Sequence, residues 1–291
     1  MRSGQASGRI GFTLVEVLVA VAIIGTLMAL LFPAIQRVRE SANRARCASN
    51  LQQLALAFYT HASQRGMILP TGGSPTPPNQ STPTNDGWGR QITEELDKNL
   101  QILYCPSRRR VGVFGNGTQQ TDYVGVGNIF ASITITDKNV CNGCLVPWFQ
   151  NQPPGQQICR RVSITNDIPD GRATTLLLAE KSIDRKAMEA ARDLHGDYWG
   201  YAFGWPPGPR APNGQTTQGF DTLRWPQTQP FQDTYTGTTP SYTFGSGHLG
   251  TFNAVSADQS LRRIRYTVDL NVLRAACTRN GGENVDLRQL E

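Results

Sequence analysis

The chain contains six cysteines, whose thiols can form disulfides or bind a metal ion: Cys47, Cys105, Cys141, Cys144, Cys159 and Cys277. An even number of cysteines is compatible with disulfides if the domain lies in an oxidising compartment, and spacing alone leaves their connectivity open. Cys141 and Cys144 form a C-x2-C pair, but a zinc site of that type normally needs a second pair. We therefore expect disulfides and no metal.

A histidine and an aspartate near the end of the chain form the second candidate group. Nine residues separate His248 from Asp258. A histidine at the entry of a hairpin and an aspartate at its turn are more simply a structural hydrogen-bond pair than a catalytic or metal-binding pair. No serine or cysteine has the context of an activated nucleophile, and no phosphate-binding or dinucleotide-binding motif is present. We expect no catalytic residue, no cofactor and no enzyme activity.

An aromatic run from Tyr198 to Trp205 offers a third kind of chemistry. The faces of Trp and Tyr rings stack on sugars, so a glycan is a candidate ligand, with Trp199 and Trp205 as the residues to test. The simpler interpretation is that these rings alternate between the core and the surface of a strand.

The element that dominates the N-terminus is an uncharged run of 19 residues, from Val17 to Ile35. A helix of about 20 apolar residues crosses the hydrocarbon core of a bilayer, whereas the apolar region of a cleavable signal peptide is shorter. Glu16 stands at the start of this run, where a charge is costly in lipid and needs a reason. We expect a membrane-spanning helix with a functional carboxylate near its beginning.

The string GFTLVEVLVAVAIIGTLMALLFP (11–33) resembles the leader and first helix of type IV prepilins and type II secretion pseudopilins. The resemblance implies that a prepilin peptidase cuts between Gly11 and Phe12 and that Phe12 is then N-methylated. It also implies that Glu16 neutralises the terminal amine of a neighbouring subunit during assembly. Pro33 matches a proline common in that helix, where it kinks the chain by removing one backbone hydrogen bond.

Charge and composition bound the remaining functions. Charged residues make up only 17% of the chain, and the net charge of +6 gives a pI near 9.1. Residues 1–50 contain six arginines against two glutamates, so they hold +4 of the +6. The positive charge therefore flanks the apolar run, and we expect no nucleic-acid partner.

The rest of the chain predicts an α+β body. The first helix continues in amphipathic form to about Ala62, and short helices are expected at 90–100 and 270–278, the latter capped by Asp269. Strand-like runs occur at 123–129, 132–136, 162–165, 173–180, 252–257 and 261–267. The predicted organisation is a leader (1–11), a transmembrane half-helix (12–35), an amphipathic half-helix (36–62) and an extracytoplasmic body (63–291).

A second resemblance extends in patches over nearly the whole chain. The blocks RARCASNLQQLALAFYTH (44–61), YCPS (104–107), TDYVGVGN (121–128) and IPDGRATTLLLAEKS (168–182) are similar to those of the DUF1559 family of prepilin-like proteins. The resemblance implies a disulfide between Cys47 and Cys105, which leaves the other four cysteines to form two more. That family closes with His, nine residues and Asp-Gly, whereas Gln259 replaces the glycine here. This puts the tight turn in doubt, because Gly tolerates a positive φ and Gln does not.

Taken together, these features predict a pilin-like fold, with a long N-terminal helix packed on a mainly antiparallel sheet. We expect a single-pass inner-membrane protein that acts by assembly into a filament or pseudopilus and by surface display. Its expected partners are the membrane, the prepilin peptidase and other pilin-like subunits, including copies of itself. The alternative is a membrane-anchored extracytoplasmic module that binds a ligand such as a glycan and does not polymerise.

Overall fold

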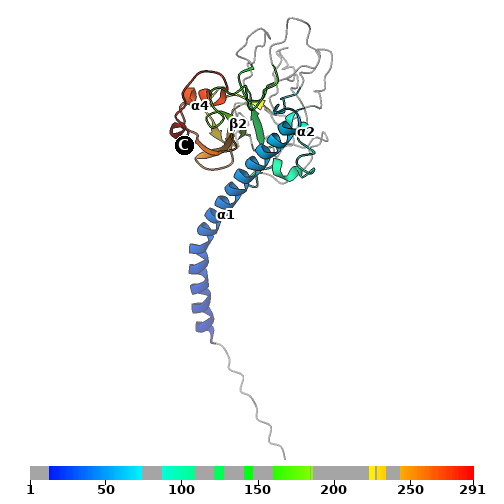
Figure 1. Cartoon of the computed structure of the whole chain (residues 1–291). Helices are drawn as coiled ribbons and strands as arrows, with labels where there is room; N and C mark the ends of the chain where they lie inside the picture. The colour runs from blue at the N-terminus through cyan, green and yellow to red at the C-terminus, as the bar shows by residue number, and fades with distance from the viewer. Residues whose placement is uncertain are drawn as a thin grey trace, which may run out of the picture. The chain divides into compact units, whose positions relative to one another are not determined.

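A computed structural model describes residues 13–73, 87–108, 121–127, 141–146, 160–183, 185, 223–226, 228–233 and 243–291. Several sequence predictions therefore lie outside the described residues: the cleavage site at Gly11 and Phe12, Cys159, the aromatic run at 198–205 and the strand expected at 132–136. The chain divides into two units, Met1–Ala42 and Asn43–Glu291. The helix α1 begins in the first unit and ends in the second (Figure 1).

Helix α1 (Leu14–Gln64) is 51 residues long and begins at a capping box. The backbone amide of Thr13 donates to Glu16 Oε2 at 2.9 Å, and the amide of Glu16 donates to Thr13 Oγ1 at 3.3 Å. These reciprocal bonds satisfy amides that have no partner within a helix. The helix ends before Gly66, which adopts a left-handed conformation with a φ of 67°, as glycine does more readily than other residues. The Met67 amide then donates a hydrogen bond to the Ala62 carbonyl and closes the end of the helix.

The described part of the first unit, residues 13–42, is helical from Leu14 onward, and its large apolar side chains are exposed. Leu14 and Leu30 are 76% and 75% exposed, and the most apolar stretch of α1 has none of its residues buried. By length and composition this helix could cross a membrane, and it is the single such helix among the described residues. Pro33 lies inside the helix, where it cannot donate a hydrogen bond to the Ala29 carbonyl.

The second unit is built on a five-stranded sheet with the order β3-β1-β2-β6-β7. Its strands are β1 (Tyr123–Val126), β2 (Leu176–Glu180), β3 (Leu223–Arg224), β6 (Thr251–Ser256) and β7 (Leu261–Arg265). Strands β1, β2, β6 and β7 pair antiparallel in turn, and β3 joins β1 in parallel. A separate parallel pair is formed by β4 (Phe231–Gln232) and β5 (Gly245–Ser246). The prediction of a mainly antiparallel α+β body is confirmed.

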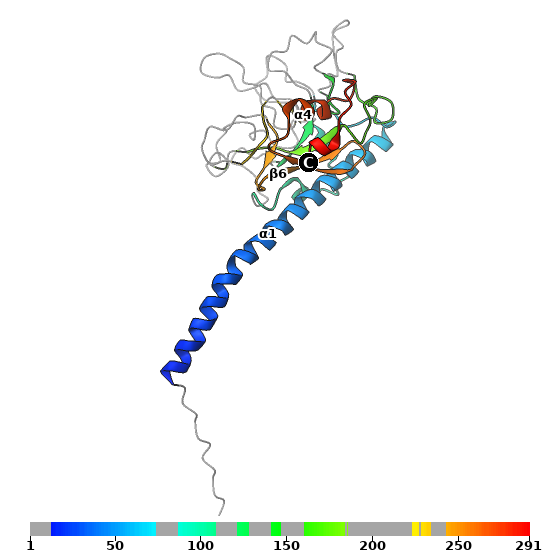
Figure 2. The same ribbon diagram turned by 90° about the vertical axis from the view of Figure 1, so that its left-hand side faces the viewer.

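Both faces of this sheet are covered, because two hydrophobic clusters lie on opposite sides of it. One cluster contains Leu51 and Phe58 from α1, and the other contains Leu273 from helix α4 (Leu270–Cys277). Figures 1 and 2 both show the sheet between α4 and the part of α1 within this unit. All five residues of β2 are buried, as expected for a central strand. Its Leu177 and Leu178 both join the α1 cluster, since the register with β6 shifts at this point.

Two of the expected elements differ most from the sequence prediction. The segment 162–165 contributes only an isolated bridge, between Ser163 and Ile68. The helix expected over 90–100 reduces to α2 (Trp88–Gln91) and the 3-10 helix η1 (Leu100–Leu103). Asp97 and Lys98, with φ values of 49° and 58°, lie in the left-handed region and therefore interrupt it. The packing of α2 against α1 includes Trp88, whose ring centroid lies 5.4 Å from that of Phe58.

The C-terminal elements follow the sequence closely. Strands β6 and β7 form the expected hairpin, and Asp269 caps α4 by accepting a hydrogen bond from the Asn271 amide at 2.7 Å. The hairpin keeps its tight turn although Gln259 replaces glycine, and Gln259 adopts a φ of 71°. A further short element among the described residues is a 3-10 helix, η3 (Leu287–Gln289).

Candidate functional site

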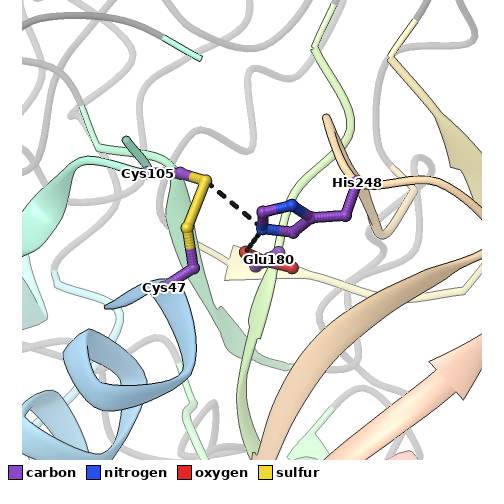
Figure 3. Close-up of side chains that lie close together, drawn as sticks. All are labelled: Cys47, Cys105, Glu180 and His248. Carbon is purple, nitrogen blue, oxygen red and sulfur yellow. Dashed lines mark hydrogen bonds and ion pairs between the residues drawn. A yellow bond between two sulfur atoms is a disulfide. The ribbon is translucent and has the colours of Figure 1, made fainter. Parts of the chain in front are cut away.

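A buried disulfide joins Cys47 on α1 to Cys105, two residues beyond η1 (Figure 3). The two Cα atoms are 5.3 Å apart, and both cysteines have no exposed surface. The loop that carries Cys105 is held to the start of β1 by Asp122. The Cys105 amide donates to Asp122 Oδ2 at 2.7 Å, and the Asp122 amide donates to the Leu103 carbonyl at 2.8 Å. The disulfide therefore links α1 to a loop that is itself fixed to the sheet.

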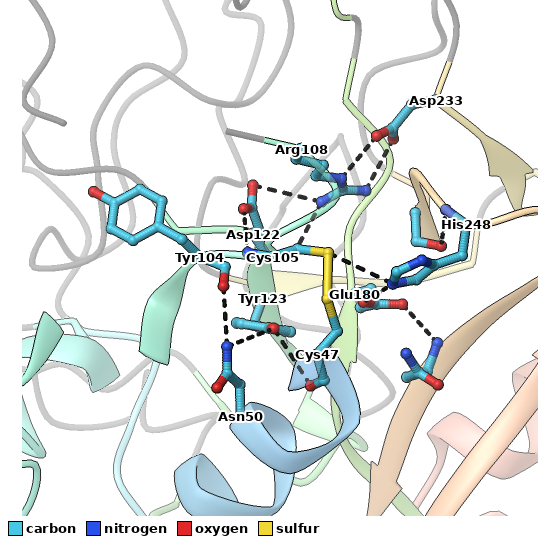
Figure 4. The surroundings of a disulfide bond; sticks show 12 residues. Cys47, Asn50, Tyr104, Cys105, Arg108, Asp122, Tyr123, Glu180, Asp233 and His248 are labelled. Carbon is cyan, nitrogen blue, oxygen red and sulfur yellow. Dashed lines mark hydrogen bonds and ion pairs between the residues drawn. A yellow bond between two sulfur atoms is a disulfide. The ribbon is translucent and has the colours of Figure 1, made fainter. Parts of the chain in front are cut away.

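Hydrogen bonds from the same turn of α1 reinforce this link. Asn50 Nδ2 donates to the Tyr104 carbonyl at 3.0 Å, and the Tyr123 hydroxyl donates to the Cys47 carbonyl at 3.4 Å (Figure 4). Burial raises the pKa of Tyr123 well above its ordinary value, and the nearby Glu180 carboxylate raises it further. The phenol therefore stays protonated at physiological pH and remains a donor to the helix.

A histidine and a glutamate lie directly against the disulfide. His248 comes from the loop between β5 and β6, and Glu180 is the last residue of β2. His248 Nε2 is 3.5 Å from Cys105 Sγ and 3.4 Å from Glu180 Oε1 (Figure 3). Glu180 Oε2 accepts a hydrogen bond from the Asn253 amide at 2.7 Å. Both side chains are fully buried.

Next to this group, Arg108 forms a buried ionic network with two aspartates (Figure 4). Its guanidinium donates to both carboxylate oxygens of Asp233, at 2.7 and 2.9 Å, and lies 3.6 Å from Asp122 Oδ1. Burial alone would lower the pKa of Arg108, but the carboxylates of Asp233, Asp122 and Glu180 raise it above its ordinary value. Further donation to the Lys181 and Gly245 carbonyls satisfies the guanidinium, as a buried cation requires.

The ligand-type atoms of Cys47, Cys105, Glu180 and His248 all lie within 4.8 Å of one another. Two sulfur atoms, one imidazole nitrogen and one carboxylate oxygen are the donors that zinc accepts, but a sulfur in a disulfide is not a thiolate ligand. In the oxidised protein, Cys47 and Cys105 form a covalent cross-link, and Glu180 and His248 are buried polar side chains beside it.

The remaining cysteines correct part of the sequence prediction. The expectation of two further disulfides is wrong for Cys144 and Cys277, which are free, buried thiols. Burial raises the pKa of Cys144 to about 12. Cys141 is disulfide-bonded, and Cys159 lies outside the described residues. Both free thiols belong to hydrophobic clusters, so they are accommodated as small apolar side chains.

The structure places His248 and Asp258 in different surroundings. We expected a hydrogen-bonded pair, but the His248 side chain faces the disulfide, whereas Asp258 lies in the turn between β6 and β7. There Asp258 Oδ1 accepts from the Ser260 amide at 2.9 Å and from the Ser260 hydroxyl. Asp258 thus shapes the hairpin turn, and the partners of His248 come from other parts of the chain.

Sequence reasoning missed Glu180, Arg108 and Asp233 as members of the site. The one available signal was Glu180, a carboxylate at the end of the otherwise apolar strand LLLAE. A fully buried carboxylate needs a partner, so this position could have been flagged. Arg108 and Asp233 carry no such signal, because neither lies in an apolar run.

Comparison with known proteins adds two family matches. A family described as "Protein of unknown function (DUF1559)" matches residues 36–99 and 90–271, which is more than half of the chain. The "Prokaryotic N-terminal methylation motif" matches residues 7–32. Together with the apolar helix, this motif supports a single-pass membrane anchor. The search of curated proteins found no match, and the search of solved structures found none either.

Proposed function

This chain belongs to the DUF1559 family, and on that premise we propose that it is a prepilin-like subunit processed by a prepilin peptidase. The peptidase cuts between Gly11 and Phe12, and Phe12 is N-methylated. The processed protein then acts by assembly into a filament or pseudopilus and by display of its body. It performs no catalysis of its own. The N-terminal methylation motif, which covers this cleavage site, supports the proposal.

The observation that carries the proposal is the apolar part of α1. Its large side chains are about half or more exposed on every side of the helix, from Leu14 at 76% to Val38 at 69%. A helix that is apolar all round is stable only in lipid or among other apolar helices. Membrane anchoring and helix-to-helix assembly are the two situations that provide such surroundings, and a pilin-like subunit passes from the first to the second.

Glu16 gives the assembly step its chemistry. Its Oε2 accepts from both the amide and the hydroxyl of Thr13, at 2.9 and 2.8 Å. A carboxylate can accept about four hydrogen bonds, so this cap leaves capacity for a further donor. In the proposed assembly, that donor is the methylated amine of Phe12 in a neighbouring subunit. Pairing the two charges lowers the cost of holding each in an apolar environment.

The capping role and the charge of Glu16 can be tested separately. Glutamine supports a capping box as glutamate does, but it carries no charge. We expect Glu16→Gln to preserve membrane insertion and reduce assembly at least about tenfold, because a difference of 1.4 kcal/mol already gives that factor. The measurement is the amount of processed protein in sheared surface fractions or in cross-linked oligomers.

Glu40→Gln is the matched control, since it removes a carboxylate from the same helix outside the apolar run. It should assemble as the wild type does. Wild-type assembly by Glu16→Gln would contradict the proposed charge pairing, whatever the state of the cap.

We further propose that the body lies outside the cytoplasm. Its support is the Cys47–Cys105 disulfide, because such bonds persist mainly in oxidising compartments. The alternative function, glycan binding by a module that does not polymerise, stays a prediction that rests on the sequence of 198–205. Loss of polysaccharide binding in Trp199→Ala or Trp205→Ala would support that alternative.

A further inference from the structure

We propose that Cys47, Cys105, Glu180 and His248 form a zinc-binding site when the two cysteines are thiols. The same buried group would then have two alternative states, one closed by the disulfide and one closed by zinc. Either state fixes α1 to the sheet. This inference concerns the body of the protein and does not depend on filament assembly.

The positions of the donor atoms fit a tetrahedral zinc ion. With Zn–S near 2.3 Å and Zn–N or Zn–O near 2.0 Å, neighbouring ligands of a tetrahedral site are roughly 3.3 to 3.8 Å apart. His248 Nε2 lies 3.5 Å from Cys105 Sγ and 3.4 Å from Glu180 Oε1. All four donors are already within 4.8 Å of one another, so the main change required is separation of the two sulfur atoms.

Glu180 supplies an independent indication that this site accommodates a ligand. Its Oε1 is buried and has no hydrogen-bond partner, although it points toward His248 (Figure 3). Leaving a buried polar atom without a hydrogen bond costs about 1–3 kcal/mol, and more for a charged group. The other oxygen, Oε2, is held by the Asn253 amide, so the carboxylate is oriented for a cation at Oε1.

The backbone of His248 is held in place by two hydrogen bonds. The His248 amide donates to Ser246 Oγ at 3.1 Å, and its carbonyl accepts from the Tyr266 hydroxyl at 2.9 Å. On the opposite side of the site, the Cys105 amide is fixed by Asp122. These hydrogen bonds fix the backbone from which the His248 and Cys105 side chains extend, and they exist here before any ion binds.

The conversion between the two states balances in protons and electrons. Zinc binding converts both thiols to thiolates and releases two protons. Formation of the disulfide removes two electrons from the two sulfurs. A disulfide-exchange oxidant takes up these electrons with two protons and leaves as a dithiol, and the zinc ion is released. The thiols of a newly synthesised chain therefore give the zinc state first, and oxidation gives the disulfide state.

The test uses the full chain in detergent, purified without oxygen in a phosphine reductant and supplied with Zn²⁺ alone. We expect one zinc ion per reduced chain and its release when the disulfide forms, measured by elemental analysis. X-ray absorption at the zinc edge should show two sulfur and two nitrogen or oxygen ligands. This measurement needs no variant, so it stands even where a substitution impairs folding.

Variants then locate the site. A chain with Cys141, Cys144, Cys159 and Cys277 all changed to Ser should retain the zinc. In that background, His248→Ala should weaken zinc binding by at least about tenfold, the lower end of the loss that follows from disturbing metal-site residues. Less than half an equivalent of zinc in the reduced wild type, or a site with four sulfur ligands, would overturn the proposal. Unchanged affinity in His248→Ala would overturn it as well.

Discussion

Removal of the Cys47–Cys105 disulfide should destabilise the body by an amount that follows from the length of the loop it closes. The two cysteines are 58 residues apart in sequence. The chain-entropy relation for a loop of that length gives about 14 cal/mol/K, or about 4 kcal/mol at 25 °C. For a domain of this size, each 1 kcal/mol lowers the melting temperature by about 2–4 °C, so a fall of about 8–16 °C is expected.

The perturbation is the double variant Cys47→Ala with Cys105→Ala, which removes the bond without leaving buried thiols. Thermal and denaturant unfolding of this variant should be compared with those of the oxidised wild type in the same detergent. The matched control is Cys144→Ala with Cys277→Ala, which also removes two buried sulfur atoms but no disulfide. We expect the control to lose about 1–2 kcal/mol, from small cavities alone.

A loss below about 1 kcal/mol in the Cys47/Cys105 variant, or equal losses in the two double variants, would contradict the expected role of the disulfide. Either result would mean that the hydrogen bonds of Asn50 and Tyr123 hold α1 on the sheet without help from the disulfide.

Substitutions at three positions test further parts of the structure. Asp233→Ala should lower the free energy of unfolding by about 3–5 kcal/mol, because it leaves the buried Arg108 guanidinium without its bidentate partner. Chemical denaturation measures this loss, and a loss below about 1 kcal/mol would contradict the prediction. Gln259→Gly should raise the melting temperature by about 1–4 °C. A left-handed conformation costs a non-glycine residue about 1–2 kcal/mol, and the larger conformational entropy that glycine loses on folding offsets only part of this gain. Gln259→Ala should give no gain, because alanine also has a Cβ atom. Burial raises the pKa of Cys144 from 9.0 to about 12, so its contribution to stability is fully present below pH 9 and is lost as pH rises toward 12. Cys144→Ala should therefore make the alkaline decline in unfolding free energy shallower by about 1.4 kcal/mol per pH unit, and an unchanged slope would show that the thiol is not the titrating group.

Elements with a strong local signal could be predicted from the sequence. Helix α1 follows from an apolar run joined to an amphipathic one, and α4 follows from its Asp269 cap. The β6–β7 hairpin follows from two alternating runs on either side of a short turn. In each case the residues that form the element lie next to one another in the chain.

The remaining fold and most of the site depend on contacts between distant residues. Strand β2 is buried on both faces only because α1 and α4 cover them, so its bulge has no local signature. His248 meets Cys105, 143 residues away, and Glu180 meets the backbone of Asn253, 73 residues away. The spacing of His248 and Asp258 favoured a local pair, and the sheet topology overrode it.

The turn at Gln259 shows how context can override a local preference. Gly is the residue that tolerates a positive φ, and its replacement cast doubt on the turn. The pairing of β6 with β7 from Thr251 to Arg265 nevertheless imposes the turn on glutamine.

The most direct test of the central claim is the mass of the native N-terminal peptide from cells that contain a prepilin peptidase. We predict that the mature chain begins at Phe12, lacks Met1 to Gly11, and carries one methyl group on its terminal nitrogen. A mature chain that keeps Met1, or one cut elsewhere, would contradict the assignment of this protein as a processed prepilin-like subunit.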